Sequence, residues 1–81
     1  MTELFAFVLA RTTETARAAA RRGDIPAERF HLGSVAIVDA MRRDFEADPR
    51  EARELVRYLC RTAASYAHHP DFRSQWLLEV R

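Results

Sequence analysis

The sequence contains no lysine and no asparagine, and only one cysteine, two glycines and three prolines among its 81 residues. So few turn-forming residues argue against an all-β fold, whereas fourteen alanines favour helices. The single cysteine, Cys60, cannot form an internal disulfide, which favours a reducing compartment. No apolar run approaches the roughly 20 residues that span a bilayer. The short apolar block Leu4–Ala10 follows an acidic residue and lacks the basic flank of a signal peptide, so we expect a soluble, cytoplasmic protein without membrane contact.

Composition and charge are those of one small globular domain, which we place at residues 1–81. Hydrophobic residues make up 48% of the sequence and charged residues 31%, values that argue against a disordered or fibrous chain. Thirteen arginines against twelve acidic residues leave a net charge of +1, so the chain as a whole has no strong attraction for nucleic acid. A chain of this length buries only about 60% of its unfolded surface. We therefore expect more apolar surface than the interior can hold.

Apolar residues recur with helical spacing in four segments, which predicts an all-α fold. We expect helices at residues 2–22, 27–47, 49–67 and 71–80. The first three are predicted to form a three-helix bundle, and the last to be a short amphipathic helix packed across it. Because so short a helix is marginal in water, it must dock on another surface.

Local signals set the predicted helix boundaries. Gly23 is a C-terminal stop for the first helix, and Pro26 is tolerated in the first turn of the second. Asp48, Pro49 and Glu51 have the spacing of a capping box, which predicts that Asp48 is the N-cap of the third helix.

The predicted core consists of apolar residues that share one face of each long helix. Its members are Leu4, Phe5, Val8, Phe30, Ile37, Met41, Phe45, Leu55, Val56, Leu59 and Tyr66. Small side chains at Ala16, Ala19 and Ala20 predict that a neighbouring helix approaches closely. Gly33, inside the second helix, indicates a break or a close backbone contact.

Several apolar residues fall outside this core and predict a protein partner. Leu32 and Val35 lie off the main stripe of the second helix, as in a helix that contacts two neighbours or a second subunit. Phe72, Trp76 and Leu77 form an apolar group whose aromatic rings are suited to anchoring in a partner. The alternative for this second group is packing back onto the three-helix core. We predict partner binding at these five residues, by a second copy of the chain or by another protein.

Arg50, Arg53, Arg57 and Arg61 occupy a narrow arc of the third helix. Four guanidinium groups in one stripe repel one another unless anions intervene, which indicates a site for nucleic acid or another phosphate-bearing partner. The alternative is a solvated helix face. No aromatic residue is interleaved with the stripe, and the low net charge also disfavours nucleic acid.

The sequence contains no acid pair, glycine-rich phosphate loop or nucleophile elbow, so we predict no catalytic residue and no cofactor. His68, His69 and Asp71, with His31 and Cys60 elsewhere, raise the question of a metal site. Adjacent histidines on a helix point about 100° apart and do not converge on one ion. We therefore predict no metal site, and expect these histidines to end the third helix and interact with its last carbonyls.

The segment from Tyr66 to Trp76 reads Y-A-H-H-P-D-F-R-S-Q-W. It resembles the ending Y-A-x-H-P-D-[YF]-R-x-x-W of a family of small helical actinobacterial proteins of unknown function. The resemblance implies an actinobacterial source and carries no mechanism. The chain size, the helical pattern and Leu59-Cys60-Arg61 are also similar to the small subunits of cyclodipeptide oxidases, which implies an accessory place in an oxidoreductase complex.

Taken together, these patterns predict a non-catalytic protein-interaction module. It is expected to be a homodimer or the small accessory subunit of a larger assembly. The alternative is the arginine-stripe binder of nucleic acid or another phosphate-bearing partner.

Overall fold

The computed structural model describes residues 2–48 and 52–79, and within these ranges every regular element is helical. The chain order is α1 (Thr2–Arg21), α2 (Ile25–Ala47), α3 (Ala52–Ala64) and a short 3-10 helix, η2 (Ser74–Glu79). The all-α prediction is confirmed. No helix in the described part of the chain is long and apolar enough to cross a membrane.

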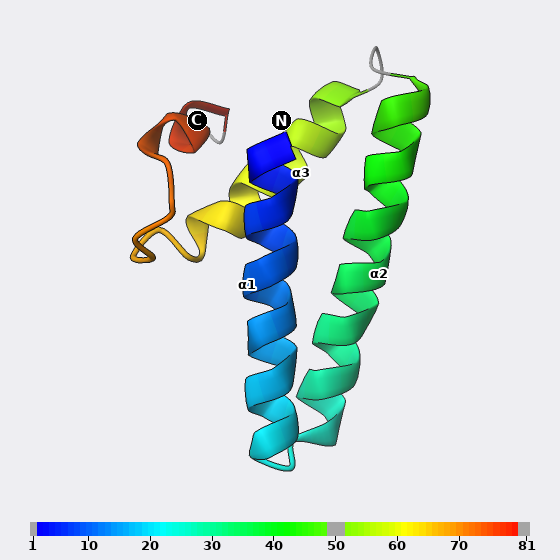
Figure 1. Ribbon diagram of the computed structural model, residues 1–81, viewed down its shortest axis with the longest axis vertical. Helices are drawn as coiled ribbons and strands as arrows, with labels where there is room; N and C mark the ends of the chain where they lie inside the picture. The colour runs from blue at the N-terminus through cyan, green and yellow to red at the C-terminus, as the bar shows by residue number, and fades with distance from the viewer. Residues whose placement is uncertain (1, 49–51, 80–81) are drawn as a thin grey trace.

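A tight turn joins α1 and α2 into an antiparallel hairpin, visible as the blue and green helices of Figure 1. Gly23 has a positive φ of 73°, and its N–H donates to the Ala20 carbonyl at 3.0 Å. The Asp24 N–H donates to the Ala19 carbonyl at 2.9 Å, which completes a Schellman motif. The Asp24 carboxylate then accepts from the Ala27 N–H at 3.2 Å and caps α2. Because of this cap, α2 begins at Ile25, two residues earlier than predicted.

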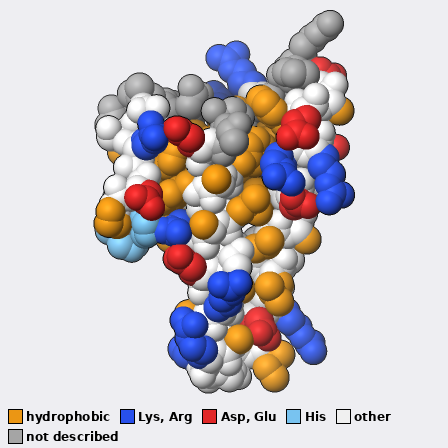
Figure 2. Space-filling view, viewed as in Figure 1, with side chains coloured by type: hydrophobic (Ala, Val, Ile, Leu, Met, Phe, Trp, Pro, Cys, Tyr) orange, Lys and Arg blue, Asp and Glu red, His pale blue; other side chains and the backbone are white. Residues whose placement is uncertain are grey.

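Small side chains let the two long helices pack closely near this turn. Ala16 and Ala19 are 2% and 0% exposed, as predicted, whereas Ala20 is exposed. Towards the other end of the hairpin the side chains become larger, and Val8 and Val38 are both buried. In Figure 2 hydrophobic side chains gather along the upper part of the seam between α1 and α2. Gly33 lies in uninterrupted helix with open space around it, so the predicted break or close contact is absent.

Helix α3 crosses behind α1 and touches α2 only sparsely (Figure 1). Its 13 residues make a rod of about 20 Å, against about 34 Å for the 23 residues of α2. Much of α2 is therefore left without a covering helix. α3 ends at Ala64, three residues before the predicted end, and the chain continues in turns. Pro49 and Glu51 of the predicted capping box lie outside the described residues, and Asp48 is the C-cap of α2.

The C-terminal segment returns along α1. The predicted helix at 71–80 is replaced by turns and by η2, a 3-10 helix that packs beside α3 and the start of the hairpin (Figure 1). Several backbone hydrogen bonds in this segment join the N–H of one residue to the carbonyl three residues earlier, as in a 3-10 helix. One of them joins the Trp76 N–H to the Arg73 carbonyl at 3.0 Å.

The hydrophobic core sits where α1, α2, α3 and η2 meet. Its larger buried members are Leu4, Phe5, Phe7, Val8, Val38, Leu59, Cys60 and Trp76. Phe45, Leu55, Val56 and Tyr66 are half-buried against it. Two predicted core residues are wrong: Phe30 is 70% exposed and Ile37 is 51% exposed, because α3 crosses behind α1 and leaves this flank of α2 uncovered.

Candidate docking groove

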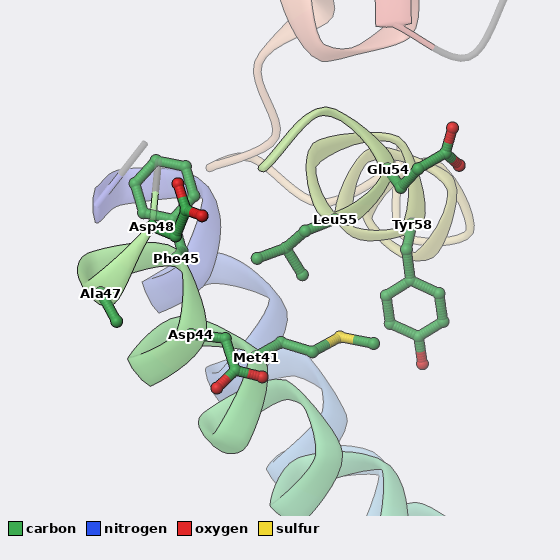
Figure 3. A pocket seen from close by; sticks show the side chains of 8 residues that line it. All are labelled: Met41, Asp44, Phe45, Ala47, Asp48, Glu54, Leu55 and Tyr58. Carbon is green, nitrogen blue, oxygen red and sulfur yellow. The ribbon is translucent and has the colours of Figure 1, made fainter. Parts of the chain in front are cut away.

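Two cavities lie between α2 and α3, and together we call them the α2/α3 groove. Its upper part is a cavity of about 500 Å³ that Figure 3 shows from close by. Leu55 and Tyr58 reach into it from α3, and Met41 reaches towards them from α2 (Figure 3). Acidic side chains from both helices line the same cavity: Asp44, Asp48 and Glu54.

The lower part of the groove is a second cavity of about 470 Å³. Tyr58 lines both cavities. The walls of the lower cavity include Phe30 and His31 from α2 and Arg61 from α3. Thr12, from α1, also lines this lower cavity. Its buried Oγ1 has no hydrogen-bond partner in the described part of the chain. Acidic side chains therefore line the upper part of the groove and an arginine lines the lower part, with apolar side chains in both.

Phe30 and Ile37 are large apolar side chains left open to solvent on this flank of α2. Placed at about 100° per residue, they lie close together around the helix and next to Met41. Phe30 lines the lower cavity, whereas Ile37 lies on the same flank outside the lining of both cavities. Their helical spacing predicts an apolar face correctly, but no sequence signal shows that α3 leaves this flank uncovered, so both were missed as surface residues.

The predicted partner residues do not form one surface. Leu32 is 51% exposed but lies about 140° around α2 from Ile37, on the flank away from the groove. Val35 is half-buried. Trp76 is 9% exposed and Phe72 and Leu77 are half-buried, so this C-terminal group follows the alternative of packing onto the core.

Phe7 is the centre of the C-terminal packing. Four aromatic rings surround it with centroid distances between 5.1 and 6.5 Å: Tyr66, His69, Phe72 and Trp76. Aromatic pairs at such distances and tilts add stabilisation beyond the area they bury. The clamp, by which we mean residues 66–77 packed on α1, is therefore a structural unit.

Polar contacts flank this aromatic cluster on the same stripe of α1. The three pairs are Thr15 Oγ1 with the Tyr66 hydroxyl at 2.9 Å, the Glu3 carboxylate with the Arg73 guanidinium at 3.0 Å, and the Arg11 guanidinium with the His69 Nε2. Together with Phe7, the α1 members are spaced four residues apart, one per turn. The segment from Tyr66 to Trp76 thus includes the residues that hold the chain's end against α1.

The arginine stripe is exposed wherever the structure describes it. Arg53, Arg57 and Arg61 are all open to solvent, and none forms an ion pair with another residue in ranges 2–48 and 52–79. Arg50 lies outside these ranges. Of the three, Arg61 borders the lower end of the groove.

The histidines near the end of α3 have a different role from the one predicted. His69 Nδ1 accepts a hydrogen bond from the Asp71 N–H at 3.1 Å, and its Nε2 contacts the Arg11 guanidinium. The ring therefore contacts its own segment and α1 instead of the last carbonyls of α3. His68 is exposed, and Cys60 is buried in the core. Among the described residues, no three His, Cys, Asp or Glu side chains converge as a metal site would require.

Comparison with known proteins gives no relative for this chain. No family model, no curated protein and no solved structure matches it.

Proposed function

We propose that this chain is a non-catalytic protein-interaction module of the cytoplasm that docks a protein surface in the α2/α3 groove. It acts as one half of a homodimer or as the small accessory subunit of a larger assembly. The observation that carries this proposal is the exposure of Phe30 and Ile37, at 70% and 51%, beside the groove. Scattered apolar residues are normal on a surface, but large ones gathered on a groove are typical of an interaction site.

The shape of the groove suits an elongated occupant. Along α2 its lining extends from Phe30 to Asp48, a span of about 27 Å at 1.5 Å per residue. Apolar side chains line both parts of the groove beside charged ones, an arrangement that an amphipathic helix recognises. The buried position of Trp76 removes the competing surface at the end of the chain.

Replacing Ile37 by a photo-crosslinking amino acid tests this proposal in the cells that naturally contain the protein. We expect covalent adducts of discrete mass after irradiation, because an exposed side chain on the flank of α2 beside the groove contacts a protein docked there. The matched control is the same amino acid at Leu32, which is equally exposed, at 51%, on the other flank of α2.

Discrete adducts from position 37 and none from position 32 support the proposal. The absence of adducts from position 37, in cells that contain the folded chain, contradicts it. Equal labelling from both positions also contradicts it, because the two flanks then behave alike.

A second candidate function is binding of nucleic acid or another phosphate-bearing partner through Arg53, Arg57 and Arg61. The observation that favours it is that these three exposed guanidinium groups have no ion-pair partner within the described ranges. Fluorescence anisotropy with short RNA and DNA at two salt concentrations tests it. This function predicts salt-sensitive binding that Arg57→Ala weakens, and it is removed if no binding is measured.

A further inference from the structure

We infer that the occupant of the α2/α3 groove is a second copy of this chain, related to the first by a two-fold axis beside Ile37 and Tyr58. This inference rests on the proposed function, because it names the partner that the groove takes. Three features of the described residues carry it: the order of charges along the groove, the position of Tyr58 midway between them, and the surface area of the isolated chain.

Charges of opposite sign lie at the two ends of the groove. On α3, Glu54 lines the upper cavity and Arg61 the lower one. On α2, Asp44 adds a second acidic side chain to the upper cavity. Neither Glu54, Arg61 nor Asp44 forms an ion pair within residues 2–48 and 52–79, so their charges face solvent without compensation.

A two-fold axis matches these charges with one another. In an isologous dimer each surface meets the same surface rotated by 180°, so the upper end of one copy lies on the lower end of the other. Glu54 then faces Arg61 of the second copy, and Arg61 faces its Glu54. A partner of a single charge sign would satisfy one end of the groove and be repelled by the other.

One exposed apolar residue of the lining lies where such an axis passes. Tyr58 lines both cavities and is midway along α3 between Glu54 and Arg61, while Ile37 lies on the adjoining flank of α2, outside the lining of either cavity. Tyr58 is 37% exposed and Ile37 is 51% exposed. Near the axis of an isologous dimer a residue meets its own counterpart, so both become buried by the same contact.

The surface of the isolated chain is larger than that of a compact monomer. A compact monomer of 9.4 kDa exposes about 5000 Å². This chain exposes 5693 Å². The fold is therefore less closed than is usual for a chain of this mass. The radius of gyration, 13.0 Å, likewise exceeds the value of about 12 Å for a compact domain of this length.

Charge reversal at Glu54 and Arg61 gives a test that depends on the two-fold arrangement. Glu54→Arg places two arginines opposite each other twice in the homodimer, and Arg61→Glu does the same with two glutamates. We expect each variant to have a dissociation constant about tenfold or more above that of the wild-type chain at low salt. An equimolar mixture of the two variants restores opposite charges at both contacts, so sedimentation velocity should show heterodimers of wild-type affinity.

Arg53→Glu is the matched control, because it makes the same charge change on α3 outside both cavities and should leave the dissociation constant unchanged. Far-ultraviolet circular dichroism confirms that all three variants are folded. A wild-type chain that stays monomeric at every concentration overturns the inference, and so does a mixture that associates no better than the separate variants.

The failure of this inference is distinguishable from failure of the proposed function. If the purified chain is monomeric while the crosslinker at Ile37 forms adducts with a protein of another mass, the groove takes a different partner. That result overturns the second copy and leaves the interaction module standing. If position 37 forms no adduct of any mass, both proposals fall.

Discussion

At the scale of single residues, apolar character does not decide which side chains are interior. Phe7 and Phe30 are the same residue type on neighbouring helices, yet Phe7 is 7% exposed and Phe30 is 70% exposed. The difference is whether another segment lies over them. Phe7 is covered by Trp76 and its neighbours from the clamp, whereas Phe30 borders an open cavity between α2 and α3.

This contrast predicts a large loss of stability when one aromatic side chain is truncated and almost none when the other is. Trp76→Ala should lower the free energy of unfolding by about 3–5 kcal/mol, because it removes a buried ring from the Phe7 cluster. That is a large part of the roughly 4–12 kcal/mol expected for a domain of this length. Phe30→Ala should change the stability of the dilute monomer by no more than about 0.5 kcal/mol.

Urea unfolding followed by circular dichroism measures both variants under the same conditions. The protein concentration must be low enough that association does not contribute to the stability. A small loss for Trp76→Ala would show that the clamp is not packed on α1 in solution. A large loss for Phe30→Ala would show that this ring is covered within one chain.

At the scale of elements, the two glycines make a matched pair of backbone sites. Gly23 has φ +73° at the end of α1, a conformation in which a Cβ is strained, whereas Gly33 is helical with open space around it. Gly23→Ala should therefore lower the free energy of unfolding by about 1–2 kcal/mol. Gly33→Ala should raise it by about 0.5–1 kcal/mol, since alanine is the better helix former.

Thermal or urea unfolding of the two dilute variants checks this prediction directly. The opposite signs matter more than the sizes. If both substitutions shift stability in the same direction, the hairpin turn or the continuity of α2 differs from the one described.

How far the sequence predicts these elements follows from the range of each signal. Helical periodicity and the local signals at Gly23 and Pro26 act within a few residues, and they predict α1, α2 and their turn to within two residues. The exposure of Phe30 and Ile37 depends on where α3 lies in space, which no local pattern encodes. The 3-10 form of η2 likewise depends on the aromatic packing around Phe7, a contact between segments far apart in the sequence.

The same limit applies to the candidate site. The sequence predicts an interaction surface from excess apolar residues, but it places that surface at Leu32, Val35 and the C-terminal aromatic group. The structure places Trp76 in the core and leaves the α2/α3 groove open instead. The groove combines residues from two helices whose crossing is set by packing on α1. The residues that line it could therefore be identified only from the three-dimensional structure.

At the scale of the whole molecule, the chain is elongated and only partly closed. Its principal extents are 40 × 27 × 18 Å, and one long helix, α2, has a flank that no other element covers. The core formed by α1, α3 and the clamp holds the two walls of the groove in place. A second copy seated in the groove covers the flank of α2 and brings opposite charges together at both ends.

Sedimentation equilibrium of three chains tests this central claim most directly: the wild type, Ile37→Asp and Leu32→Asp. The two substitutions introduce the same charge at positions of equal exposure, 51%, on opposite flanks of α2. The account predicts that the wild type and Leu32→Asp reach twice the 9.4 kDa monomer mass, while Ile37→Asp remains at the monomer mass. Equal association of Ile37→Asp and the wild type, or loss of association only in Leu32→Asp, would contradict it.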